Sequence, residues 1–193
     1  AEGSSAESAD GIDITAANGV EVSQLEADND VQITAGTTIA QARNGGIVAH
    51  TLRTSSGGRQ ILDGANRIAS FAAANTGGGS IKLNNISALS IIGITQAAGG
   101  DVDITNAGDL QISGTVSTVD QVELNVAGRI IEGAAGKVRG ERLVTSSVGG
   151  QILLGDNRIR SFHASNQGGD IELSNNGCDL ETIGINQVDG GDI

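Results

Sequence analysis

Two stretches of this chain, 91 residues apart, carry almost the same sequence. Residues 54–76 match residues 145–167 at 15 of 23 positions, and the similarity extends to both sides: IDITAANGVEV from Ile12 matches VDITNAGDLQI from Val102. The chain is therefore two copies of one long unit. A fold that accepts such duplication is built by stacking, because a new copy lengthens the stack without needing a new kind of core.

Inside each unit the apolar residues come in short pairs separated by one polar residue, such as Val102 with Ile104 and Val122 with Leu124. A period of two predicts β-strands, and the clusters of Gly, Asn, Asp and Ser between the pairs predict tight corners. No segment carries a sustained helical stripe. The strands expected at Ile81, Val102 and Val122 begin about 20 residues apart, a spacing typical of the turns of a parallel β-solenoid.

We therefore predict an all-β chain folded as a right-handed parallel β-helix, a β-solenoid of about nine rungs of about 20 residues. At a strand spacing of about 4.8 Å, such a stack is about 40 Å long. The right-handed sense is favoured because the rungs are irregular and lack a strict six-residue repeat. An antiparallel sandwich is the alternative, but it needs tight hairpins at regular spacing and more aromatic residues between its sheets.

The composition fits a thin core. The chain has no Pro, Met, Trp or Tyr, only two Phe, and 30 Gly. A narrow stack has little room for aromatic rings, so Ile, Leu, Val and Ala are expected to fill its interior. We assign solenoid unit 1 to residues 11–100 and solenoid unit 2 to residues 101–193. The polar residues 1–10 are expected to be a linker or a cut end.

The net charge of −12 argues against nucleic acid and anionic membranes as partners, because both attract surfaces rich in Lys and Arg. Lys137, Arg139 and Arg142 are interleaved with acidic residues, so we expect them on a solvated face. No apolar run is long enough to insert into a membrane as a spanning helix. Cys178 is the single cysteine, which rules out an intrachain disulfide and is compatible with export.

Three phrases resemble the repeats of filamentous haemagglutinin-like exoproteins: ITAGTTIAQARNGGIVAHTLRTSSGG from Ile33, GANRIASF from Gly64 and GGDVDITNAGDLQISGTV from Gly99. These are large bacterial proteins exported by two-partner secretion or related routes. The resemblance covers nearly all of residues 11–193. It implies a right-handed β-helical shaft that projects adhesive or toxic domains from a cell, and it carries over no catalytic residue.

The strongest candidates for a functional role are Asn66 with Arg67 and Asn157 with Arg158, because both copies keep them. A structural role is the favoured interpretation. Asn tolerates left-handed turns and stacks in hydrogen-bonded ladders, while the Arg ties down a corner carbonyl or a nearby Asp. A ligand site is the alternative.

Phe71 and Phe162 also occupy matching positions, so we expect both rings to plug the same corner of the core. His50 and His163 do not align with each other, and no Ser or Cys lies at a spacing that would make either one a catalytic base. We expect both histidines on the surface. The Gly-Gly-Asp corners are similar to calcium-binding nonapeptide repeats, but the nine-residue ladder of such repeats is absent, so no metal or other cofactor is expected.

We expect a structural shaft segment of an extracellular bacterial adhesin or surface fibre, with no enzymatic activity and no catalytic, cofactor-binding or metal-binding residues. The alternative is a carbohydrate-active β-helix, a polysaccharide lyase or hydrolase. The cleft of such an enzyme needs clustered carboxylates or a basic residue, and aromatic rings that stack on sugars, whereas this chain has no Trp or Tyr.

The last four residues, GGDI, match the GGDV at residues 99–102, which leads directly into an expected strand. We therefore expect the chain to be part of a longer repetitive protein, or a subunit that stacks end to end. The expected partners are further copies or flanking repeats of the same solenoid, together with host or matrix surfaces.

Overall fold

The computed structural model describes residues 4–8, 10–177 and 179–193, and every regular element among these residues is a β-strand. In chain order the strands are β1 (Ser4–Ser8), β2 (Gly11–Ala16), β3 (Val20–Ala27), β4 (Asp30–Ala35), β5 (Ile39–Ser56), β6 (Gln60–Asn75), β7 (Ile81–Asn85), β8 (Leu89–Gln96), β9 (Val102–Asn106), β10 (Leu110–Ile112), β11 (Thr115–Ser117), β12 (Gln121–Val126), β13 (Ile130–Glu132), β14 (Lys137–Ser147), β15 (Gln151–Gly168), β16 (Ile171–Asn175) and β17 (Glu181–Asp189). Within the described part of the chain, no helix is long and apolar enough to cross a membrane.

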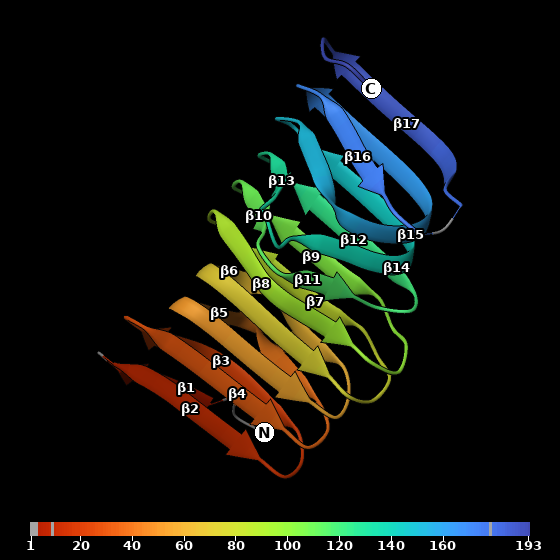
Figure 1. Cartoon of the computed structure of the whole chain (residues 1–193). Coiled ribbons are helices and arrows are strands. Elements are labelled where there is room, and N and C mark those ends of the chain that lie inside the picture. The colour runs from red at the N-terminus through yellow and green to blue at the C-terminus, as the bar shows by residue number, and fades with distance from the viewer. Residues whose placement is uncertain (1–3, 9, 178) are drawn as a thin grey trace.

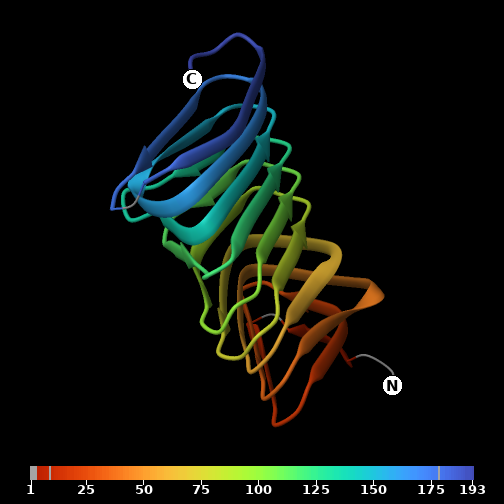
Figure 2. The same cartoon turned by 90° about the vertical axis from the view of Figure 1, so that its right-hand side faces the viewer.

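The strands pair in parallel with strands one turn away and stack as a β-solenoid, which Figures 1 and 2 show from two directions. Two columns of paired residues follow the stack, and we call them side A and side B. Side A is the column Ile12, Val31, Leu52, Phe71, Ile91 and Ile112. Side B is the column Val20, Ile39, Gln60, Ile81, Val102, Val122, Leu143, Phe162 and Thr182.

The nine levels of side B enclose about eight turns, so each turn takes about 20 residues. The all-β class, the parallel solenoid and the turn length predicted from the sequence are confirmed. The right-handed sense stays a prediction. The antiparallel sandwich is excluded, because the strand pairs of the described residues run in parallel.

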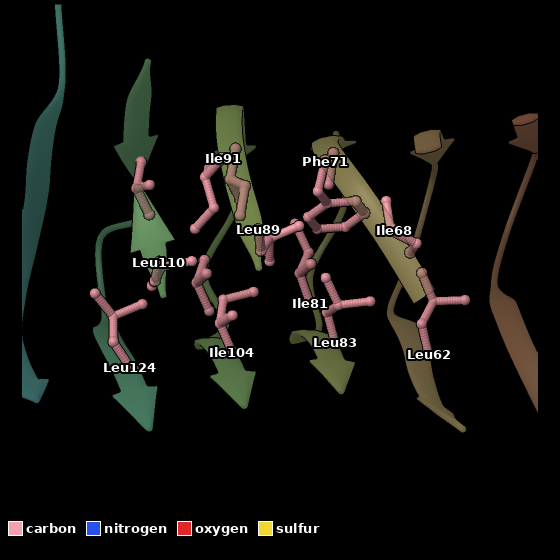
Figure 3. Close-up of a cluster of buried hydrophobic side chains, with 14 of the residues drawn as sticks. Leu62, Ile68, Phe71, Ile81, Leu83, Leu89, Ile91, Ile104, Leu110 and Leu124 are labelled. Atoms are coloured by element: carbon pink, nitrogen blue, oxygen red, sulfur yellow. The ribbon is translucent and has the colours of Figure 1, made fainter. Parts of the chain in front are cut away.

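The interior is a single apolar stack that runs along the whole solenoid. Figure 3 shows part of it, with Leu62, Leu83, Ile104 and Leu124 from successive turns lying one after another. The burial along β12 alternates between half-buried and buried residues, as the period of two predicts. Consecutive turns therefore bury the same kind of aliphatic side chain at corresponding positions. The burial of these side chains against one another stabilises the stack.

Matching positions of the two copies of the repeat lie on different sides of the solenoid. Their offset of 91 residues is about four and a half turns. Accordingly Ile12 and Phe71 lie on side A, whereas the matching Val102 and Phe162 lie on side B. Both sides need the same alternation of buried and exposed residues, so one sequence serves on either of them.

The boundary between the two units is not a domain boundary. β9, at the start of unit 2, pairs in register with β7 of unit 1, from Ile81 opposite Val102 to Asn85 opposite Asn106. The units over residues 11–100 and 101–193 are therefore copies in sequence that form one continuous stack.

The expectation of a linker at residues 1–10 differs from the structure at residues 4–8. Ser4–Ser8 form β1, which pairs in parallel with β3 from Ser4 opposite Val22 to Ser8 opposite Ala27. Pairing of this kind joins backbone groups and needs no apolar side chain. The polar composition of the segment therefore gave no sign of the strand.

Candidate functional site

Asn66 is completely buried and lies at the centre of a polar network in the corner that follows side B in unit 1. Its Oδ1 accepts hydrogen bonds from the backbone N–H of Ile47 at 2.9 Å and from Nε2 of Gln41 at 2.8 Å. Its Nδ2 donates to the carbonyl oxygens of Leu62 at 3.0 Å and Asn84 at 2.9 Å. One side chain thus joins three successive turns of the solenoid.

Asn157 repeats this arrangement in unit 2 and is also completely buried. Its Oδ1 accepts from the backbone N–H of Val138 at 2.6 Å, and its Nδ2 donates to the carbonyl oxygens of Leu153 and Ser174, both at 3.1 Å. The position that Gln41 fills in unit 1 is taken by Glu132, whose Oε2 accepts from Asn157 Nδ2 at 3.0 Å. The two Asn therefore hold equivalent corners together.

Further buried Asn side chains continue the polar rows. Asn66 pairs with Asn85 in register, Asn85 pairs with Asn106, and Asn85 Nδ2 donates to Asn106 Oδ1 at 2.9 Å. Such hydrogen bonds satisfy groups that would be costly to bury unpaired. The interpretation of the Asn as ladder residues is thus confirmed. Their backbones are not left-handed, because no described residue other than glycine has a positive φ.

The Arg side chains that follow these Asn are on the surface. Arg67 is exposed, and Arg158 is half exposed, with its Nη2 3.7 Å from Asp156 Oδ2. Arg139 shares the same carboxylate oxygen at 3.6 Å. Ion pairs as exposed as these contribute at most about 1 kcal/mol each. The predicted link between Arg158 and a neighbouring Asp is confirmed, and it occurs at the solvated surface.

Of the three clustered basic residues, Lys137, Arg139 and Arg142 are each half-buried, so the expected solvated face is only partly solvated. The Nε atoms of Arg139 and Arg142 have no hydrogen-bond partner among the described residues.

Phe71 and Phe162 are both inside the core, with exposed fractions of 0% and 1%. Phe71 pairs with Leu52 and Ile91 on side A, and Phe162 pairs with Leu143 on side B. The prediction that both rings fill the core is confirmed, whereas the expectation that they fill the same corner is wrong. They occupy the same position in the repeat but different sides of the solenoid, because of the half-turn offset between the copies.

The Asp residues of the Gly-Gly-Asp corners bind backbone groups of a neighbouring turn. Asp101 Oδ1 accepts from the N–H of Gln121 at 3.2 Å, and Asp170 Oδ1 accepts from the N–H of Asp192 at 2.8 Å. The preceding Gly100 has φ of 124°, a conformation that side chains disfavour, which explains the glycine. Among the described residues, no three His, Cys, Asp or Glu side chains are grouped closely enough to hold a metal ion.

The two histidines lie apart from these corners. His50 is exposed, and His163 is half-buried on side B beside Gly184. The prediction that both lie at the surface is therefore confirmed for His50 and only partly for His163. Cys178 lies outside the described residues.

A shallow surface groove of about 440 Å³ lies over β8 and β10. Its described lining includes one carboxylate, Asp109, whose Oδ1 accepts from the N–H of Arg129 at 2.9 Å and whose Oδ2 lies 3.8 Å from Arg129 Nη2. Glycoside hydrolases commonly use a pair of carboxylates, one on each side of the bond that is cleaved. This groove does not bring such a pair together.

The polar partner of each central Asn was not predicted from the sequence. Gln41 and Glu132 are separated by the same 91 residues as Asn66 and Asn157, so extending the alignment towards the N-terminus would have paired them. The sequence similarity between the two copies is weak here, because the residues that follow differ: QARNGG from Gln41 in unit 1 and EGAAGK from Glu132 in unit 2.

Compared with known protein families, characterised proteins and solved structures, the chain gives no significant match.

Proposed function

We propose that this chain is a structural shaft segment of an extracellular bacterial adhesin or surface fibre. The observation that carries the proposal is the uninterrupted parallel stack, in which unit 2 continues unit 1 without a break between β7 and β9. Eight turns at a strand spacing of about 4.8 Å give a rod of about 40 Å. In such a rod the repeated sequence sets the distance between whatever lies at the two ends.

The chemistry of the corners supports the same proposal. The best buried polar groups, at Asn66 and Asn157, are saturated by contacts within the solenoid and leave few groups to meet a ligand. The resemblance of the repeats to filamentous haemagglutinin-like exoproteins supports a surface location.

Antibodies raised against the purified chain should label intact cells that express the parent protein. Labelling is expected without permeabilisation, because the shaft is proposed to lie outside the cell, and brief protease treatment of intact cells should remove the signal. An antibody against a cytoplasmic protein of the same cells is the control. Labelling that appears only after permeabilisation would contradict the extracellular location.

We also propose that the ends of the stack pair with further turns of the same solenoid, either flanking repeats or other copies. β2 pairs with β4 on one edge and β17 pairs with β15 on one edge, and neither has a second partner strand among the described residues. On β16 the N–H of Ile171 already donates to the carbonyl oxygen of Asp192 in the following turn. Ile183 and Val188 on β17 are 50% and 62% exposed. Unpaired backbone edges beside exposed apolar side chains favour the addition of another strand.

Purified chain should form linear oligomers whose length increases with concentration at neutral pH, as seen by electron microscopy and sedimentation. Fusing a polar capping turn directly after Ile193 should suppress them, because the cap occupies the open edge of β17. The same cap attached through a long flexible Gly/Ser linker is the control and should suppress them less. Rods that stay monomeric at every concentration would refute end-to-end pairing of copies.

A further inference from the structure

Gln41 and Glu132 occupy the same position in the two copies of the repeat. Their side chains differ in one atom, because the amide nitrogen of Gln41 is replaced by a carboxyl oxygen in Glu132. Gln41 follows the side B strand segment that begins at Ile39, and Glu132 ends β13. Each reaches the backbone N–H of a glycine and the side chain of the central Asn of its corner: Gly64 and Asn66 in unit 1, Gly155 and Asn157 in unit 2. The corner of unit 1 therefore shows how an amide is held at the position that a carboxyl group occupies in unit 2.

In unit 1 the Gln41 amide is fully paired. Its Oε1 accepts from the N–H of Gly64 at 2.8 Å and from Asn66 Nδ2 at 3.3 Å, while its Nε2 donates to Asn66 Oδ1 at 2.8 Å. The two side-chain amides thus form a reciprocal pair in which each donates to the other. Asn66 Oδ1 also accepts from the N–H of Ile47.

In unit 2 only half of this arrangement is present. Glu132 Oε2 takes the place of Gln41 Oε1 and accepts from the N–H of Gly155 at 2.6 Å and from Asn157 Nδ2 at 3.0 Å. Glu132 Oε1 takes the place of Gln41 Nε2, and it is buried with no hydrogen-bond partner among the described residues. Comparison with the Gln41–Asn66 pair of unit 1 assigns Oε1 a position opposite Asn157 Oδ1, an acceptor that already binds the N–H of Val138.

Water has little access to this oxygen. The backbones of the corner approach closely: a Cβ built on Gly155 would lie 2.1 Å from the carbonyl oxygen of Gly136 and 2.9 Å from Glu132 Oε2. A Cβ on Gly136 would lie 2.2 Å from the carbonyl oxygen of Ile112. Two acceptor oxygens that face each other in so tight a corner are unfavourable unless a proton lies between them.

We propose that Glu132 is a proton-operated latch that closes the corner between β13 and β15. When Glu132 is protonated, its Oε1–H donates to Asn157 Oδ1 and reproduces the bond that Gln41 Nε2 makes to Asn66 Oδ1. When it is ionised, that bond is lost and two oxygens with partial or full negative charge face each other. The inference concerns the chain itself and does not depend on the proposed shaft function.

The surroundings of Glu132 disfavour its ionised form. Burial raises its pKa above the ordinary value of 4.5, while the hydrogen bonds from Gly155 and Asn157 act in the opposite direction. The charged side chains closest to this corner along the chain are Lys137 and Arg139 on β14, and Asp156 and Arg158 on β15, the strand that pairs with β13. β10, the other strand that pairs with β13, contributes none. Asp156 and the two Arg pair with one another at the surface, on the opposite side of the strand from Asn157.

The direction of the pH effect follows from this raised pKa. The folded chain binds the proton of Glu132 more tightly than the unfolded chain does, so the latch contributes its full stabilisation below about pH 4.5. That contribution is lost as the pH rises through the raised pKa of the folded state. Acidification thus tightens the corner, and a rise in pH through that raised pKa loosens it.

The test compares Glu132→Gln with its mirror variant Gln41→Glu in dilute solution. At pH 7.5 Glu132→Gln should raise the Tm by about 2–4 °C, because an amide completes the bond to Asn157 at any pH. Gln41→Glu should lower the Tm at pH 7.5 by a similar amount, because it recreates the unpaired oxygen in unit 1. At pH 4 both differences from the unaltered chain should shrink to within about 1 °C.

If Glu132 had only a structural effect, the Tm differences between the variants and the unaltered chain would not change with pH, and this result would overturn the latch. A Glu132→Gln variant that is no more stable than the unaltered chain at pH 7.5 would also overturn it. A direct measurement does not depend on unfolding. The carboxyl carbon resonance of Glu132, assigned by its absence in Glu132→Gln, should titrate with a pKa above 4.5. A midpoint at or below that value would equally refute the proposal.

Discussion

Replacing Phe71 with alanine should lower the free energy of unfolding by about 3–5 kcal/mol, because the ring is fully buried and the thin core leaves a cavity in its place. The ring points into the stack of Ile and Leu side chains on side A (Figure 3). Urea denaturation followed by circular dichroism measures the loss. Because the chain has only two Phe and no Trp or Tyr, no neighbouring aromatic ring can move to fill the cavity.

Phe162→Ala provides the matched variant in unit 2 and should cost about the same, since its ring is 1% exposed at the equivalent position on side B. Val119→Ala is the surface control: its side chain is 63% exposed, and the loss should stay within about 0.5 kcal/mol. Losses below about 1 kcal/mol for both Phe variants would contradict the role of the rings in the core.

Replacing Asn66 with alanine should cost at least about 3 kcal/mol, even though it removes only a small polar side chain. The change leaves the N–H of Ile47, the amide of Gln41 and the carbonyl oxygens of Leu62 and Asn84 without the partner they have now. Each buried group left unpaired costs about 1–3 kcal/mol. The same urea experiment, with hydrogen exchange at the amide of Ile47, measures the effect, and that amide should exchange much faster in the variant.

Asn84→Ala is the control for Asn66→Ala. Asn84 lies on the adjacent turn, is half-buried, and makes one side-chain hydrogen bond that the structure resolves, from its Nδ2 to the carbonyl oxygen of Gly64 at 3.0 Å. Its loss should cost about 0.5–1.5 kcal/mol. If Asn66→Ala proves no more damaging than Asn84→Ala, the central position of Asn66 in the corner is refuted.

The alternation of apolar and polar residues was sufficient to predict the strands and their stacking. Val102 with Ile104 and Val122 with Leu124 are buried in the structure as the period of two predicts, and the spacing of about 20 residues is the turn of the solenoid. These features depend on residues close together in sequence and on a spacing that repeats, so they can be read without any knowledge of which strands touch.

The candidate site was predictable only in part. The duplication singled out Asn66 and Asn157, and the capacity of Asn for hydrogen-bonded ladders favoured a structural role, which the bonds between turns support. The expected left-handed backbone is absent. The partners Gln41 and Glu132 lie 25 residues from them, on the turn before. Only the three-dimensional register brings Gln41 or Glu132 into contact with the central Asn of its corner. The consequence of having an amide in one copy and a carboxyl group in the other could therefore not be predicted from the sequence.

Local sequence patterns were enough to predict parallel strands, a thin aliphatic core and two copies of one unit. The tertiary structure decided that the copies lie half a turn apart, which places Phe71 and Phe162 on different sides, and that the polar segment Ser4–Ser8 forms a strand against β3. The half-turn offset and the strand at Ser4–Ser8 escaped prediction for the same reason. Local periodicity specifies which face of a strand is buried, whereas register and edge pairing arise from backbone contacts between residues about one turn apart, and many different side chains permit those contacts.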